Sequence, residues 1–167
     1  MIATTDDIRK IRPIADNVQD MERMSVYIPE VESGIIIQTI GAHVYRRIDE
    51  QDATITPEQM NLILDGGYYT GRCGNEKYTN GLKSAISYLV YSRFIIKNPI
   101  NITAFGNVFK RTEFSEKIDE ATLIRESRST EKLGNEHLRQ TVDYLQTIGL
   151  FSCVVKKTSY RKKFNAI

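Results

Sequence analysis

Apolar residues recur every three or four positions along most of the chain, which is the spacing of amphipathic helices. The clearest stripe predicts a long helix over residues 78–97, stopped by the Asn-Pro pair that follows. A second stripe predicts a helix from Pro29 to about residue 50, with close helix packing at Gly34 and Gly41. The first stripe consists of Leu82, Ala85, Ile86, Leu89, Val90 and Phe94, and the second of Val31, Ile36, Ile37, Ile40, Val44 and Ile48.

Two shorter helices are predicted from their end signals. Thr5 precedes two aspartates, which is typical of an N-cap with acids in the first helical turn, and Pro13 ends this element. Thr56 as N-cap and Pro57 at the first helical position predict a helix of about two turns. The glycine pair 66–67 marks its end.

In the C-terminal half, the pattern changes from helix to hairpin and then back to helix. Residues 100–114 alternate apolar and polar positions around Phe105-Gly106-Asn107 and predict a small β-hairpin. Helical pieces follow at 116–127 and 130–148, with Gly149 as a stop signal, and the final FSCVVKK predicts a strand. The second piece carries an apolar face of Leu133, Leu138, Val142, Leu145 and Ile148.

These elements predict a mainly α fold. We expect a helical bundle of about four to five helices with a small β-hairpin and a C-terminal strand or arm. Residues 1–150 would form one helical domain with the hairpin inserted at about 100–114, and residues 151–167 a basic C-terminal arm.

Charge is distributed unevenly, although the net charge of the 167 residues is only +2. Residues 1–60 hold 11 acids and 6 bases, whereas residues 61–167 hold 10 acids and 17 bases. The last 17 residues contain five bases and no acid, which suits contact with nucleic acid or an acidic partner, or a solvated terminal segment. No apolar run approaches the ~20 residues that span a bilayer, and no signal peptide is evident, so we expect no membrane partner.

Residues 66–73 read GGYYTGRC, close to the phosphate-binding pattern GxxxxGK[ST]. Arg72 stands where that pattern has lysine, and Cys73 offers no hard oxygen ligand for magnesium. A predicted helix precedes the glycines, whereas a phosphate loop follows a buried strand. We therefore interpret the stretch as a glycine-rich hinge between helices. An enzyme of unrecognised type that uses residues 66–74 as an anion site stays open as an alternative function.

Other candidates for chemistry are sparse. His43 and His137 lie in separate elements without metal-ligand spacing, and we interpret His43 as a packed or surface residue. The acids 49, 50 and 52 predict a solvated turn, and the two cysteines, Cys73 and Cys153, predict buried small hydrophobes of a reduced, intracellular chain. We predict no catalytic residues, cofactor or metal, although pairing of residues far apart in sequence stays open.

Several stretches in order resemble the head-to-tail connector proteins of tailed bacteriophages, including those of crAss-like phages of gut bacteria. The first is MSVYIPEVESGIIIQTIGAHVYRRIDE, residues 24–50. The second is LDGGYYTGRCGNEKYTNGLKSAISYLVYSRFI, residues 64–95, with its Cys-Gly loop and Tyr-x-x-Tyr-x-Arg-Phe run. TAFGNVFKRTEFSEKID and a long C-terminal helix follow. The resemblance covers about residues 5–148.

The resemblance implies a non-enzymatic virion protein of the neck, made in the host cytoplasm. It would form a ring, typically of twelve copies, between the portal protein and another connector or tail protein. Double-stranded DNA would pass through the channel without sequence-specific binding. Glycine loops, hairpins and terminal arms serve subunit and portal contacts in such rings. The expected interface residues are Phe105, Gly106, Asn107, Lys110, Arg111, Lys156, Lys157, Arg161, Lys162 and Lys163. The alternative function is a small helical nucleic-acid-binding protein that uses the basic tail.

Overall fold

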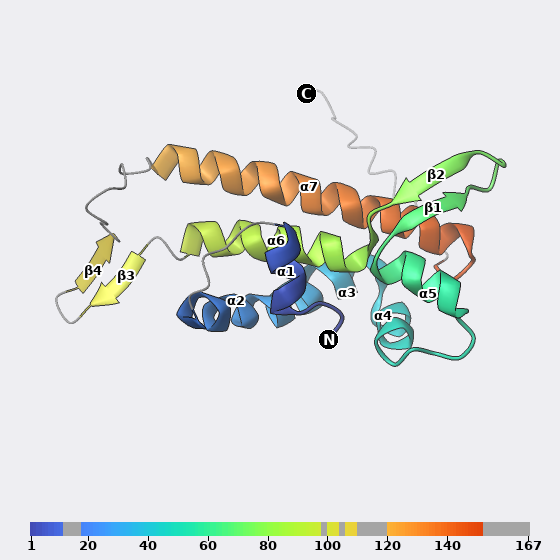
Figure 1. Cartoon of the computed structure of the whole chain (residues 1–167), viewed down its shortest axis with the longest axis horizontal. Helices are drawn as coiled ribbons and strands as arrows, with labels where there is room; N and C mark the ends of the chain where they lie inside the picture. Colours follow the sequence, from blue (N-terminus) through green and yellow to red (C-terminus); the bar gives the residue numbers. More distant parts are fainter. Residues whose placement is uncertain (12–17, 98–99, 104–105, 110–119, 152–167) are drawn as a thin grey trace, which may run out of the picture.

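The computed structural model describes residues 1–11, 18–97, 100–103, 106–109 and 120–151. It is mainly helical with small antiparallel hairpins, as the sequence predicts. At its centre lies helix α6 (Gly81–Lys97), which contacts α1 (Thr5–Ile11), α2 (Val18–Val31), α5 (Pro57–Leu64) and α7 (Glu120–Thr147). Figure 1 shows α7 running along one side of α6, α2 along the other, and α1 crossing in front.

The central position of α6 follows from its apolar residues, because nearly all of the predicted stripe is buried and Phe94 is half-buried. Helix α6 approaches α7 closely at Gly134. A Cβ atom on Gly134 would lie 2.8 Å from Cγ of Leu89 and 3.1 Å from its backbone nitrogen. The two long helices therefore meet where α7 carries no side chain.

The predicted helix over 29–50 is wrong in its start and its continuity. Helix α2 already begins at Val18 and contains Pro29, and a π-helical turn (Glu32–Ile36) follows it directly. Helices α3 (Ile37–Ile40) and α4 (Ala42–Asp49) come next. Gly41, with φ of +84°, separates them. The predicted apolar positions are buried, except for Ile37, which is half-buried.

Close packing at Gly34 and Gly41 is also not found. A Cβ atom added at either glycine would have no neighbour within 4 Å. Gly41 instead interrupts the helix with a backbone conformation that other residues rarely adopt.

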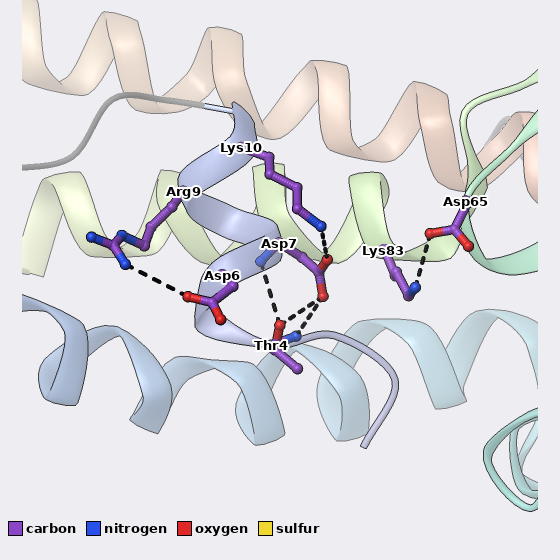
Figure 2. A network of polar contacts seen from close by, with 7 residues as sticks. All are labelled: Thr4, Asp6, Asp7, Arg9, Lys10, Asp65 and Lys83. Carbon is purple, nitrogen blue, oxygen red and sulfur yellow. Dashed lines mark hydrogen bonds and ion pairs between the residues drawn. The ribbon is translucent and has the colours of Figure 1, made fainter.

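Helix α1 is capped by Thr4, one residue before the predicted Thr5. The Asp7 amide donates to Thr4 Oγ1 at 3.4 Å, and the Thr4 amide donates to the Asp7 carboxylate at 3.0 Å (Figure 2). Lys10 Nζ pairs with the same carboxylate at 3.2 Å. Hydrogen bonds from Thr4 and the Lys10 charge outweigh burial and lower the pKa of Asp7. Pro13 lies outside the described residues.

The start of α5 is confirmed. The Gln59 amide donates to Thr56 Oγ1 at 3.2 Å, and the Thr56 amide donates to the Gln59 side chain at 3.1 Å. Pro57 occupies the first helical position, and Gly66 follows the helix with φ of +87°. This reciprocal capping box satisfies two amide donors at the helix start.

The stretch predicted as a hinge forms a β-hairpin between α5 and α6. Strand β1 (Gly67–Thr70) pairs with β2 (Glu76–Thr79) in an antiparallel register that sets Tyr68 opposite Tyr78. Helix α6 consequently begins at Gly81 and not at Tyr78. Figure 1 shows this hairpin reaching past the C-terminal part of α7.

The second hairpin is confirmed within the predicted range. Strand β3 (Ile100–Thr103) pairs with β4 (Gly106–Phe109), so Gly106 and Asn107 lie in a strand and not in the turn. This hairpin lies beyond the ends of α6 and α7, opposite the β1–β2 hairpin (Figure 1).

Helix α7 is continuous over 28 residues, so the predicted break between 127 and 130 is wrong. Leu138 and Leu145 are buried as predicted, whereas Leu133 is 42% exposed. Gly149 ends this region with φ of +74°, as predicted. The predicted C-terminal strand and Cys153 lie outside the described residues.

Candidate functional site

The β1–β2 hairpin has two different faces, because successive side chains of a strand point to opposite sides. On the inner face, Tyr69 is buried and contacts Tyr144 of α7, with ring centroids 4.8 Å apart. On the outer face, Tyr68 and Tyr78 contact each other edge to face at 4.9 Å. Tyr68 is 70% exposed and Tyr78 is 48% exposed, so the hairpin presents a pair of aromatic rings to solvent.

A row of polar contacts holds the inner face on α7. Lys77 Nζ bonds the Asp143 carboxylate at 3.0 Å, and Asn80 Nδ2 donates to Gln140 at 2.7 Å. The hydrogen bond to Asp143 and the negative charge of its carboxylate raise the pKa of Lys77. Because both partners are partly exposed, the pair contributes orientation more than stability.

Two further contacts extend this row. The hydroxyls of Thr79 and Thr141 lie 3.2 Å apart in a fully buried position. At the tip, the Arg72 guanidinium donates to the carbonyl of Gln146 near the C-terminal end of α7. The same carbonyl accepts the Gly149 amide at 3.3 Å, so two donors satisfy this carbonyl at the helix end.

Open grooves follow this seam between hairpin and helix. One has a volume of about 340 Å³ and is lined by Tyr69, Lys77, Tyr78, Arg139, Gln140 and Asp143. The adjoining one, of about 280 Å³, shares Lys77 and Asp143 and includes Arg72 and Cys73.

The cations of these grooves differ in their pairing. Lys77 is paired with Asp143, and Arg139 forms two bonds to Glu136 at 2.7 and 3.0 Å. Within the described ranges, Arg72 forms no ion pair, and its one recorded hydrogen bond goes to an uncharged carbonyl. Arg72 is therefore the cation that keeps both its charge and most of its five N–H donors for another molecule.

The geometry of this stretch differs from that of a phosphate-binding loop. Arg72 and Cys73 sit in the turn of a hairpin, and strand β2 separates them from the start of α6. A phosphate loop instead leads directly into a helix N-terminus. The predicted burial of Cys73 is wrong, since this thiol is exposed.

The fold also brings together a pair that the sequence did not reveal. Ser84 Oγ and His137 Nδ1 lie 3.0 Å apart between α6 and α7, and Tyr88 contacts the imidazole edge to face at 5.1 Å. Burial lowers the pKa of His137, although the nearby Glu136 opposes this shift. Neither residue lines the two grooves, so the pair is best described as a contact between helices.

Glu32 is a second feature that sequence reasoning missed. Its carboxylate is buried at the start of the π-helical turn and accepts bonds from the Ile2 amide at 2.7 Å and the Tyr45 hydroxyl at 2.8 Å. Burial and the Glu32 carboxylate raise the pKa of Tyr45 well above its usual range, which favours the protonated phenol that donates to Glu32. The cluster ties the N-terminal segment to α4.

The predicted interface residues fall mostly outside the described part of the chain. Gly106 and Asn107 lie in β4, where they face Thr103 and Ile102. The others, Phe105, Lys110, Arg111, Lys156, Lys157, Arg161, Lys162 and Lys163, are not among the described residues. None of the expected interface residues lies in the β1–β2 hairpin that carries the exposed tyrosines.

No group of three histidine, cysteine or acidic residues in the described ranges could hold a metal ion. No helix found there has the length and apolar character needed to cross a membrane. His43, interpreted from the sequence as a packed or surface residue, is exposed on α4.

Comparison with known proteins gives one match. A family described only as a family of unknown function (DUF6712) matches residues 36–151, which include α4, α5, both hairpins, α6 and α7. No curated protein and no solved structure matches the chain.

Proposed function

The chain belongs to that family of unknown function, and we propose that it is a non-enzymatic subunit of a head-to-tail connector ring in a tailed bacteriophage. The proposal joins the sequence resemblance to one structural observation. The outer face of the β1–β2 hairpin exposes Tyr68 and Tyr78 side by side. Tyrosine is enriched in the centres of protein interfaces, where it supplies large contact area at low entropic cost.

The arrangement of the elements suits a ring. A subunit that closes a ring needs two different surfaces, one for each neighbour. The α6–α7 pair forms an elongated body with a hairpin at each end (Figure 1). In this proposal the body forms the wall, and the hairpins contact neighbouring copies, the portal and the next connector or tail protein. The location would be the virion neck, and twelve copies would match the usual ring.

The nucleic-acid-binding alternative has less support from the described surface. The exposed bases Arg125, Arg128, Lys132 and Arg139 recur along one side of α7, but Glu136 pairs with Arg139 there and Glu131 lies one turn from Arg128. These acids reduce the positive potential that attracts a phosphate backbone. This alternative therefore rests on the arm of residues 151–167, and a gel shift with double-stranded DNA at physiological salt tests it.

The ring is tested with the full chain, alone and mixed with its portal protein, at low and physiological salt. Sedimentation velocity and negative-stain images are expected to show a closed ring in at least one of these conditions. Protein that stays monomeric in all of them would overturn the proposal.

A variant pair tests the role of the tyrosines. Changing Tyr68 and Tyr78 together to serine should leave the melting temperature close to wild type and weaken ring formation. The control is Val26→Ser on α2, which changes an equally exposed apolar residue away from the hairpin and should leave assembly unchanged. Equal loss of assembly in both variants would argue against a specific role for the hairpin.

A further inference from the structure

Residues 1–11, which we call the strap, lie across the helical body and include α1. Figure 1 shows α1 crossing in front of α6, and α1 contacts both α6 and α2. The strap buries the side chains of Ile2, Ala3 and Ile8. These are three of the 22 buried apolar side chains of the described chain, so the other 19 lie outside the strap. Most of the core can therefore stay packed when the strap leaves.

Within the strap, polar side chains bond one another. Thr4 and Lys10 both donate to the carboxylate of Asp7, as Figure 2 shows. These bonds shape α1, but a helix of seven residues is too short to be stable in water without packing. The order of the strap therefore depends on its contacts with the surface that it covers on α2, the π-helical turn and α6, which we call the socket.

Glu32 is the anchor of the strap in this socket. Its Oε1 accepts the Ile2 amide at 2.7 Å and the Ala3 amide at 3.4 Å, and its Oε2 accepts the Tyr45 hydroxyl at 2.8 Å. The carboxylate is buried in the π-helical turn, a kind of turn that is frequent at functional sites. Glu32 forms no ion pair with a cation of the described residues. Its buried charge therefore depends on two donors that the strap supplies.

The anchor holds the strap reversibly. When the strap leaves, it uncovers the carboxylate, and water replaces the two lost amides. Exchange of protein bonds for water bonds makes the net contribution of each hydrogen bond small. Segments that bury few apolar side chains open at lower free energy than the core. Opening of residues 1–11 is consequently separable from global unfolding.

We propose that the strap detaches as one unit while the rest of the fold stays closed, and that the open socket binds the same sequence from another molecule. The ligand class is a segment with two free backbone amides for Glu32 and apolar side chains at the positions of Ile2, Ala3 and Ile8. A second copy of this chain carries such a segment. The inference goes beyond the proposed ring and does not require it.

Thiol labelling of the full chain tests the opening. In a Cys73→Ser, Cys153→Ser background, Ala3→Cys and Ala85→Cys place a thiol where each alanine is fully buried, one in the strap and one in α6. Ala3→Cys should react with a thiol reagent at least about tenfold faster, because the strap opens without global unfolding. Thermal melts check that both variants are folded. Equal rates would tie the strap to global unfolding and overturn the proposal.

Glu32→Ala tests the anchor with the same two thiols. It removes the acceptor of both strap amides, so the labelling of Ala3→Cys should rise by about tenfold while that of Ala85→Cys stays unchanged. Glu22→Ala is the matched control, because it changes an exposed glutamate of α2 and should alter neither rate. Equal acceleration at both thiols would make Glu32 a stabiliser of the whole fold and overturn its role as anchor.

A peptide of residues 1–11 with a fluorophore at its C-terminal end tests the socket. Ile8→Asp in the full chain weakens its own strap and keeps Glu32, so this variant should bind the peptide at least about tenfold tighter than wild type does. Fluorescence anisotropy measures the binding. A peptide that carries Ile8→Asp should not bind. The wild-type peptide should also not bind a chain with both Ile8→Asp and Glu32→Ala.

Each outcome of the peptide experiment is decisive. An Ile8→Asp chain that cannot fold would make residues 1–11 part of the cooperative core and overturn the proposal. A folded Ile8→Asp chain that binds no peptide would overturn the socket as a binding site. Neither result bears on the ring, which is tested by sedimentation and imaging of the wild type.

Discussion

Gly66 and Gly81 lie in direct backbone contact where the chain enters and leaves the β1–β2 hairpin. A Cβ atom on Gly81 would lie 2.7 Å from the Gly66 amide nitrogen and 2.4 Å from the Leu64 carbonyl oxygen. One on Gly66 would lie 2.3 Å from the carbonyl oxygen of Thr79. Both glycines also have positive φ, +87° and +77°. The hairpin base closes only because neither position has a side chain.

Gly66→Ala is therefore expected to destabilise the fold strongly. Backbone strain and overlap with rigid backbone atoms together should cost about 3–5 kcal/mol, measured by urea unfolding. Gly74→Ala is the matched control, because Gly74 has φ of +78° but open space around it. It should cost only about 1 kcal/mol of strain. Equal losses in the two variants would contradict the close contact at the hairpin base.

Gly134→Ala tests the crossing of the two long helices. The added methyl group would press on Leu89, so a net loss of about 1–3 kcal/mol is expected despite the better helix propensity of alanine. Gly34→Ala, with no neighbour within 4 Å, should instead stabilise the protein by about 0.5–1 kcal/mol. Denaturant melts that rank the two variants in the opposite order would show that α6 and α7 are not in contact at Gly134.

Ser87 and Ser127 are both buried, but only one has a partner. The Ser87 hydroxyl has none in the described structure, whereas Ser127 Oγ donates to the Ser92 carbonyl at 2.8 Å. Ser87→Ala should raise the free energy of unfolding by about 1 kcal/mol, because it removes a buried hydroxyl without a hydrogen bond. Ser127→Ala should lower it by a similar amount. A loss of stability on Ser87→Ala would mean that this hydroxyl is bonded.

His137 should make stability depend on pH below neutrality. Burial depresses its pKa in the folded protein, so the unfolded chain binds the proton more readily than the folded one. Its contribution is fully present above the unfolded value of about 6.5 and is lost as the pH falls through the lower folded pKa. The effect is modest, because the ring is only half-buried.

Melting temperatures between pH 7.5 and 5 provide the measurement. His137→Asn, which keeps a side-chain group near Ser84, should flatten the decline relative to wild type. His43→Asn removes the exposed histidine of α4 and should retain the wild-type decline. If only the His43 variant showed a flattened profile, the pH dependence would come from His43, and the prediction for His137 would be wrong.

Elements governed by local signals were predictable from the sequence. The Thr56 capping box, the buried stripe of α6 and the Gly149 stop depend on residues within a few positions of each other. The apolar positions after Pro29 were also identified, but the helix start was not. Proline favours a first turn, but Pro29 lies near the end of α2, which packs against α6 and leads directly into the π-helical turn.

Elements governed by distant contacts were not predictable. Residues 127–130 are polar and favour a helix end by local propensity. Ser127 and Thr130 are buried in α7, and Ser127 bonds Ser92 of α6, so the helix continues. Strands β1 and β2 have four residues each, too few for a clear alternation, and their inner face rests on α7 more than 60 positions away. The exposed tyrosine pair and the solitary charge of Arg72 depend on this same placement.

The continuous helix α7 runs most of the way between the two ends of the molecule (Figure 1). Its 28 residues rise 1.5 Å each, so the helix measures about 42 Å. One hairpin lies beyond its first turn, and the other rests against its last turns (Figure 1). A single residue inserted in α7 would move one end by about 1.5 Å and rotate it by about 100° relative to the other. The β1–β2 hairpin, which is bonded to the last turns of α7, would therefore shift and turn together relative to the start of the helix.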